Sequence, residues 1–264
     1  MKKWLPFTFG SLSFIWQILF FYLPLLLLIA ASFEQGGRFY IALLKPVYFK
    51  IIFITLIVAT LSAILCALIA YPVAYFIAFR ARRYKYFLLF CLIVPFWTNF
   101  LLHVYAWFFI LDKEGFINQF LSLLNVGPFS FLNSLFGIMM MMVYTYLPFM
   151  VLPIYASLER FDRHILEASE DLGATFAQTF AKIMFPLTLP AVRTGFFLVF
   201  IPCFGEFIIP ELMGGDKYYF TGNVISQLVL GNETRGLGAA FTVIASLCLL
   251  IFITPLYKWM QRYE

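Results

Sequence analysis

Two carboxylates, Glu206 and Glu211, interrupt an apolar stretch that covers about residues 191–212. Placing an acidic side chain in the middle of a bilayer costs roughly 2.5–3.5 kcal/mol on insertion scales, so such a residue normally faces a partner or a watery path. Proline and glycine residues break the helical pattern around both carboxylates, and a broken helix exposes backbone carbonyls. Carboxylates combined with exposed carbonyls are suited to binding a cationic solute.

Each of these carboxylates also has a structural alternative. Glu206 could hold a hydrogen bond to a neighbouring helix, and Glu211 could be a cap exposed to water at the membrane interface. Trp97 and Asn99 are two further candidates for a solute pathway, because the helix break expected at Pro95 places them together. Aromatic faces attract ammonium groups, although membrane proteins also place Trp and Tyr in interfacial belts.

Catalytic and nucleotide-binding patterns are missing from the sequence. It has no Gly-x-x-x-x-Gly-Lys-Ser/Thr loop, no His-Glu-x-x-His and no Gly-x-Ser-x-Gly. The four cysteines stand singly in apolar runs, without the spacing of metal ligands or of a disulfide framework. We therefore predict no catalytic residue, no metal site and no cofactor on this chain, so any ATP is hydrolysed by another subunit.

The composition is that of an integral membrane protein. Of 264 residues, 63% are hydrophobic and only 12% are charged, and a soluble domain of this length could not bury so much apolar surface. The net charge is +5, but the basic residues lie in short runs between apolar segments, which argues against nucleic-acid binding. We expect membrane lipid to be the surrounding medium.

Six apolar segments are long enough to cross a bilayer. They cover about residues 12–33, 51–79, 86–111, 134–157, 191–212 and 239–257. The first is interpreted as an uncleaved helix rather than a signal peptide, since its apolar run is about twenty residues long. No internal repeat or low-complexity linker divides the chain, so we predict an all-α protein with one transmembrane domain over residues 1–264.

Residues 167–190 form the main polar interruption, in which two short amphipathic helices are predicted outside the membrane. Phe161, Ile165, Ala168 and Leu172 recur at spacings of four, three and four, which draws one apolar stripe along a helix. Gly173 then stands where a helix ends in a residue with positive φ. A second stripe follows, closed by prolines, and its residues are Phe176, Phe180, Ile183, Pro186 and Pro190.

The distribution of basic residues predicts the orientation of the chain. Eleven of the 18 lysines and arginines lie in the N-terminus, the run from Arg80 to Lys85, the loop at about 158–190 and the C-terminus. These segments share one side of a six-span chain. Because positively charged loops stay inside, we expect them to be cytoplasmic.

The same loop carries a family resemblance. Glu167-Ala168-Ser169, three residues, Gly173, nine residues and Ile183-Met184-Phe185-Pro186 resemble the EAA loop of ABC importer permeases, whose pattern is Glu-Ala-Ala, three residues, Gly, nine residues and Ile-x-Leu-Pro. Ser169 and Phe185 depart from it by mild changes of size. The resemblance implies the type I importer (MetI-like) fold. It also implies that Glu167, Ala168, Gly173, Ile183 and Pro186 couple the chain to a cytoplasmic ATPase dimer that binds ATP-Mg.

Further segments resemble the permeases of spermidine/putrescine importers. They are Val94 to Asn99, Leu147 to Pro153, Gly205 to Gly215 and Gly222 to Ile225, and one departure is Thr234-Arg235-Gly236 where that group has Asp-Trp-Pro. The resemblance implies a bacterial inner-membrane permease that imports polyamines. It further implies a second permease subunit, identical or homologous, and an extracytoplasmic polyamine-binding protein.

Other functions stay open at this point. The chain could import another solute such as ferric iron or thiamine, whereas a sulfate path should not keep an acidic residue such as Glu206. An ion-coupled secondary transporter would not explain the EAA-like loop. A membrane-embedded enzyme would need a nucleophile, a base or a metal set, and the sequence shows none.

Overall fold

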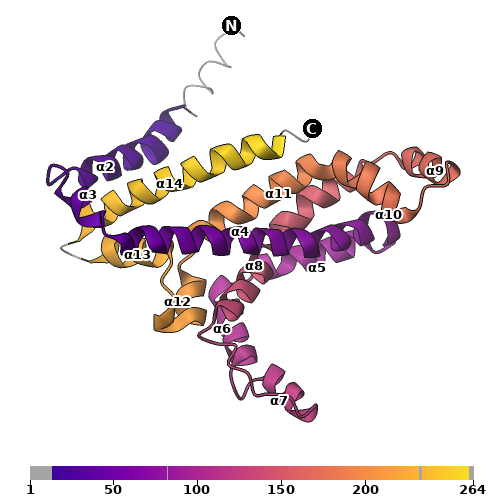
Figure 1. Ribbon diagram of the computed structural model, residues 1–264, viewed down its shortest axis with the longest axis horizontal. Helices are drawn as coiled ribbons and strands as arrows, with labels where there is room; N and C mark the ends of the chain where they lie inside the picture. The colour runs from indigo at the N-terminus through magenta and orange to yellow at the C-terminus, as the bar shows by residue number, and fades with distance from the viewer. Residues whose placement is uncertain (1–13, 82, 232–233, 262–264) are drawn as a thin grey trace, which may run out of the picture. The chain divides into compact units, whose positions relative to one another are not determined.

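The computed structural model describes residues 14–81, 83–231 and 234–261, and within these ranges every regular element is a helix (Figure 1). Five helices are long and apolar enough to cross a membrane: Phe14–Ser32, Pro46–Arg80, Leu135–Glu159, Phe176–Gly205 and Arg235–Met260. A sixth span is the pair Lys85–Trp97 and Phe100–Leu123, which is bent by 96°. The prediction of an all-helical membrane protein is confirmed, and the six predicted segments correspond to these five helices and the bent pair.

The described residues group into two compact units. The first combines Met1–Ile52 with Val224–Ile251. Within it, the Ser32 and Tyr40 hydroxyls are 2.7 Å apart, and the rings of Tyr48 and Phe241 are 5.5 Å apart. Its elements are η1 (Ile18–Tyr22), α2 (Leu23–Ser32), α3 (Arg38–Leu43), the start of α4 (Pro46–Tyr75), most of α13 (Thr221–Leu230) and most of α14 (Arg235–Gln261).

The second unit combines Phe53–Asn223 with Phe252–Glu264 and contains the predicted functional residues. After the rest of α4 its elements are η2 (Phe76–Arg80), α5 (Lys85–Trp97), α6 (Phe100–Leu111), α7 (Phe116–Leu123), α8 (Leu135–Glu159), α9 (Arg163–Asp171), α10 (Phe176–Thr179), η3 (Phe180–Met184), α11 (Phe185–Gly205), α12 (Ile208–Gly214) and η4 (Gly215–Lys217). Of these, η2 and η3 are π-helical turns.

Small residues let the long helices of the second unit pack closely. On α11, a Cβ atom added at Gly195 would lie 2.6 Å from the Met150 sulfur of α8 and 3.2 Å from the Met150 Cα atom, so glycine lets the two helices approach closely. On α4, the buried stripe consists of small side chains at helical spacing: Ala59, Ala63, Cys66, Ala70 and Ala74. The Cys66 thiol donates to the Val143 carbonyl of α8 at 3.7 Å. Close contact through small residues is the usual way in which membrane helices associate.

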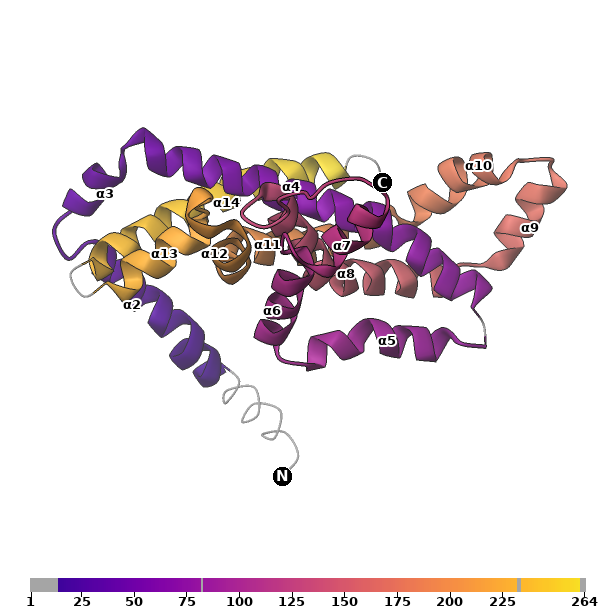
Figure 2. The same ribbon diagram turned by 90° about the horizontal axis from the view of Figure 1, so that it is seen from below.

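The third span, predicted over residues 86–111 with a break at Pro95, is interrupted a few residues later than expected. Thr98 and Asn99 adopt extended backbone conformations between α5 and α6. The Asn99 side chain accepts a hydrogen bond from the Leu101 amide at 2.9 Å and so caps α6. The two helices consequently meet at a sharp bend (Figure 2). Pro95 itself stays inside α5, and the break falls at the residue that caps α6.

The fifth span is displaced from its predicted range. It continues from α10 through η3 into α11, so Pro186 and Pro190 do not close the preceding helix. The wider turn η3 bonds the Phe185 amide to the Phe180 carbonyl, and Pro186 then occupies the first turn of α11, where a missing N–H is tolerated. The span ends at Gly205, because Glu206 is extended.

The connections between spans hold more helix than the sequence suggested. The connection after the third span contains α7. Two further helices, α3 and α13, also lie between the predicted apolar segments.

Candidate functional site

The α9–α10 hairpin, residues 163–179, is built from local capping signals. The Asp162 side chain accepts from the His164 amide at 3.0 Å and starts α9. Gly173, with φ of 77°, ends α9 as predicted, while the Ala174 amide bonds to the Ser169 carbonyl at 3.0 Å. A capping box between Thr175 and Gln178 then starts α10. The chain therefore reverses direction within a few residues (Figure 2).

Two buried hydroxyls tie the arms of this hairpin together. Ser169 on α9 and Thr179 on α10 are 4% and 5% exposed, and their side-chain oxygens are 2.9 Å apart. Ser169 also donates to the Leu166 carbonyl at 2.8 Å. The residue that departs from the Glu-Ala-Ala pattern thus has a partner across the hairpin.

This pair gives a test of hairpin stability. Replacing Thr179 by Val keeps the side-chain shape but removes the partner of Ser169, and we expect the opening free energy of the hairpin to fall by about 1 kcal/mol. Native-state hydrogen exchange of the amides of α9 and α10 measures this opening free energy. The double variant Ser169→Ala/Thr179→Val should lose less than the two single changes added together, because it leaves no orphaned hydroxyl. Additive losses would show that the two hydroxyls are not coupled.

The hairpin presents apolar side chains that nothing in the described chain covers. Ile165 and Leu172, from the predicted stripe of α9, are 39% and 88% exposed. Together with neighbouring residues they line a shallow groove of about 490 Å³: His164, Ile165, Ala168, Ser169, Leu172, Ala174 and Ile183. Exposed apolar side chains on a short, firmly capped hairpin are typical of a docking surface.

The five predicted coupling residues all belong to this hairpin or follow it directly. Ala168 and Ile183 line the groove. Glu167 is exposed on α9 and lies 3.3 Å from the Nδ1 atom of His164. Gly173 is the turn residue between the helices, and Pro186 stands at the start of α11. The structure thus places them at one end of the second unit.

Glu206 lies at the break between α11 and α12. Its Oε1 atom accepts from the amides of Phe207, Ile208 and Ile209 at 3.1, 3.0 and 3.4 Å. Its Oε2 atom accepts from the Tyr146 hydroxyl of α8 at 2.5 Å. A carboxylate at the start of a helix satisfies amides that have no helical partner. Glu206 therefore holds the joint between two helices and binds a neighbouring helix at the same time.

The same carboxylate borders a cavity of about 640 Å³, called here the Glu206 cavity. Its wall is mainly apolar and aromatic, and of the described residues that line it Glu206 alone is acidic. The lining residues include Phe96, His103, Tyr144, Thr145, Tyr146, Phe149, Pro202 and Phe207. The aromatic rings of Phe96 and Phe149 meet edge to face at 5.1 Å. One negative charge among aromatic faces suits a small organic cation.

Sequence reasoning missed a polar cluster on this wall. His103 of α6 forms a hydrogen bond with Tyr144 of α8 at 2.9 Å and a second with Thr98 at the break between α5 and α6. The run Tyr144-Thr145-Tyr146 within an apolar span was the available signal. Across the described residues, no three His, Cys, Asp or Glu side chains are grouped so as to hold a metal ion.

The other predicted pathway residues are not brought into this cavity. Trp97 is 75% exposed and packs edge to face on Phe90. Asn99 caps α6 through its side chain, and Glu211 is exposed on α12. These three lie near the two helix breaks but are not among the lining residues.

Comparisons with known proteins fit this architecture. The chain is 37% identical to the spermidine/putrescine transport system permease protein PotB of Escherichia coli (strain K12), over 90% of this chain and 92% of the relative. It is 34% identical to the PotB protein of Haemophilus influenzae, over 94% and 91% of the two chains. An Escherichia coli inner membrane ABC transporter permease protein, YdcU, is 32% identical over 80% of this chain and 72% of its own.

The fold has a counterpart among solved structures. A crystal structure of a bacterial ABC transporter involved in the import of the acidic polysaccharide alginate contains a chain that superposes with a TM-score of 0.81 at 18% identity, covering 99% of this chain and 96% of the other. The model of the family described as binding-protein-dependent transport system inner membrane component matches residues 70–263. The chain therefore belongs to this family, and it is a multi-pass permease subunit of an ABC transporter in the inner membrane.

Proposed function

We propose that this permease imports polyamines, spermidine or putrescine, through a path that includes the Glu206 cavity. The observation that carries the proposal is the position of Glu206, an acidic group at a helix break on the wall of an aromatic cavity. The PotB relatives of similar length, named as spermidine/putrescine permeases, support the substrate class.

The chemistry of the cavity suits an ammonium group. A carboxylate attracts the cation, and aromatic faces such as those of Phe96 and Phe149 add cation–π attraction that grows as water is excluded. Tyr146 already donates to Glu206 at 2.5 Å. An incoming ammonium group would therefore replace or share this hydroxyl, while the cap on α12 stays in place.

The α9–α10 hairpin is the proposed docking site for a cytoplasmic ATPase dimer, which binds ATP-Mg. Its support is the exposure of Ile165 and Leu172 beside the coupling residues Glu167 and Ala168. With this hairpin inside the cell, both termini of the six-span chain are cytoplasmic. Residues 1–264 of this chain form a single permease domain. A second permease subunit, identical or homologous, pairs with it to complete the membrane part of the transporter. An extracytoplasmic polyamine-binding protein delivers the solute.

Trp97, Asn99 and Glu211 keep a proposed role in the path. Trp97 and Glu211 are exposed on this chain near the joints of α5 with α6 and of α11 with α12. We place them at the surface that a second permease subunit covers, so that they face the solute between the two subunits.

Uptake by the purified complex tests the proposed function. The complex is isolated through a tag on this chain, reconstituted in liposomes with ATP inside or outside, and supplied with radiolabelled spermidine or putrescine and the co-purifying binding protein. We expect uptake that requires ATP and that survives collapse of the membrane potential. Uptake that follows the potential without ATP would indicate an ion-coupled transporter. Uptake of ferric iron or thiamine in place of polyamines would overturn the substrate class alone.

A further inference from the structure

The inner half of the second span presents an aromatic ridge to the α9–α10 hairpin. Tyr71, Tyr75 and Phe79 follow one another at spacings of four, which aligns them on one helical face. Each one contacts a different segment of the chain between α8 and α11. The contacts are Phe79 with Arg163 of α9, Tyr75 with Phe176 of α10 at 5.8 Å, and Tyr71 with Phe180 of η3 at 5.2 Å.

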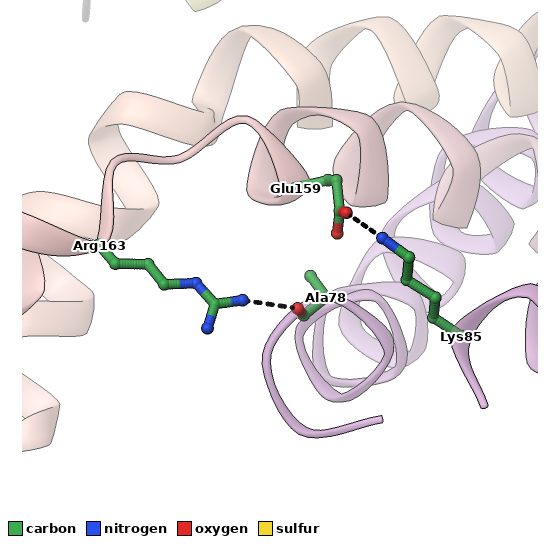
Figure 3. Close-up of polar contacts among 4 residues, drawn as sticks. All are labelled: Ala78, Lys85, Glu159 and Arg163. Carbon is green, nitrogen blue, oxygen red and sulfur yellow. Dashed lines mark hydrogen bonds and ion pairs between the residues drawn. The ribbon is translucent and has the colours of Figure 1, made fainter. Parts of the chain in front are cut away.

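Polar contacts reinforce both ends of this ridge. At one end, the hydroxyl groups of Tyr71 and Thr188, both buried, are 2.8 Å apart. At the other end, the Arg163 guanidinium donates to the Ala78 carbonyl of η2 at 3.4 Å (Figure 3). It also lies over the Phe79 ring at 5.4 Å. The chain from α9 to the start of α11 is therefore attached to the second span at several points.

The position of Arg163 needs a physical reason, because it is the first residue of α9. A cation is unfavourable at a helix N-terminus, where the helix dipole is positive. Its side chain instead reaches the last turn of η2, where carbonyls have no donor further along the helix and the dipole is negative. The favourable interaction of the Arg163 cation with the C-terminal end of η2 thus offsets its unfavourable interaction with the N-terminal end of α9.

A nearby ion pair connects different elements. Lys85 at the start of α5 and Glu159 at the end of α8 are 2.5 Å apart (Figure 3). Both residues lie outside the α9–α10 hairpin, so this pair holds two spans together without involving α9. It provides a matched comparison for Arg163 at the same end of the second unit.

We propose that Arg163 is the positioning residue through which movement of α9 is passed to the inner end of the second span, at η2. The inference rests on the proposed function, in which a cytoplasmic ATPase moves the α9–α10 hairpin. Because Arg163 bonds to Ala78 and covers Phe79, α9 and η2 move as one body when the hairpin is displaced. The ridge then carries the displacement along α4, towards the middle of the membrane.

The test compares Arg163→Met with Lys85→Met in the reconstituted complex. Methionine keeps an apolar stem over Phe79 but removes the donors to the Ala78 carbonyl. For Arg163→Met we expect normal amounts of co-purifying ATPase and normal ATP hydrolysis, with spermidine uptake per ATP reduced roughly fivefold to thirtyfold. For Lys85→Met we expect uptake per ATP within about twofold of the native complex, since α9 keeps its contact with η2.

A distance measurement shows whether Arg163 transmits the movement of α9 or only stabilises the structure. Spin labels are placed at the exposed positions Arg80 of η2 and Asp171 of α9, in a background with Cys91 and Cys248 replaced by Ser. With Arg163 present, the distance between the labels should be the same with and without trapped nucleotide. In Arg163→Met it should change when nucleotide binds.

The outcomes are distinct for the two proposals. Equal uptake per ATP in the native and Arg163→Met complexes, an equal loss in both Met variants, or a label distance that responds to nucleotide equally with and without Arg163 overturns the role of Arg163. Failure of the native complex to import spermidine overturns the substrate class, while the label distances still decide whether α9 and η2 move together. If no ATPase co-purifies with the native chain, both the proposed coupling and the role of Arg163 are wrong.

Discussion

Replacing Glu206 by Gln is expected to lower spermidine uptake by the reconstituted complex roughly tenfold to hundredfold, with the fold intact. The estimate follows from the loss of a charged hydrogen-bond acceptor in a cavity of low polarity, which is worth about 1.5–3 kcal/mol. Uptake of radiolabelled spermidine over a range of concentrations is the measurement, with the amount of assembled complex determined in parallel.

The expectation that the fold survives comes from the contacts of Glu206. The amide oxygen of Gln can still accept from the backbone amides of Ile208 and Ile209, which now lie 3.0 and 3.4 Å from Oε1. The amide nitrogen can donate to the Tyr146 oxygen, which accepts as well as donates. The substitution therefore removes the negative charge and leaves the joint between α11 and α12 capped.

Tyr146→Phe is the matched control on the other side of the same hydrogen bond. It removes the hydroxyl that now occupies Oε2 and leaves the charge of Glu206 unchanged. If the charge attracts the solute, uptake should stay within about threefold of native in this variant, because the lost bond is a single one. Native uptake by Glu206→Gln, or an equal loss in the two variants, would assign Glu206 a structural role only.

The sequence allowed most of the membrane-spanning architecture to be predicted, because hydropathy reports burial in lipid directly. It misplaced the helix boundaries where a polar backbone arrangement interrupts an apolar run. Asn99 caps α6 in the middle of the third span, and the wide turn η3 carries the helix past Pro186 into the fifth span. In both places a local hydrogen-bond pattern overrides the average composition, and a window average cannot detect it.

In the candidate site, too, some features could be predicted from the sequence and others could not. Glu206 was predicted because a carboxylate in an apolar span is costly and thus conspicuous. Its partner Tyr146 lies 60 positions away in the chain, and His103 is bonded to Tyr144 at a separation of 41. Such pairings depend on how α6, α8 and α11 pack, so no local sequence pattern predicts them. Gly173 could be predicted because its role is confined to one turn.

Glu167→Lys is expected to separate ATP hydrolysis from transport. Glu167 is exposed on α9, and its carboxylate lies 3.3 Å from the imidazole of His164 on the same helix. Lysine forms helices as readily as glutamate, so α9 should keep its caps and its buried Ser169–Thr179 contact. The changed property is the charge that the α9–α10 hairpin offers to the ATPase. We expect uptake per ATP to fall at least about tenfold, because like charges placed across an interface repel.

Glu170→Lys provides the control for this charge reversal, since Glu170 is exposed on the same helix and the change in net charge is identical. ATP hydrolysis, spermidine uptake and the amount of ATPase bound to the permease are measured for both variants. A general electrostatic effect would reduce coupling equally in the two, whereas a specific contact at Glu167 leaves Glu170→Lys within about twofold of native. Normal uptake per ATP in Glu167→Lys would remove Glu167 from the docking surface. A loss confined to Glu167→Lys, with ATPase still bound, would mean that Glu167 contacts the ATPase where the movement of α9 begins. That movement would then pass through Arg163 to the second span.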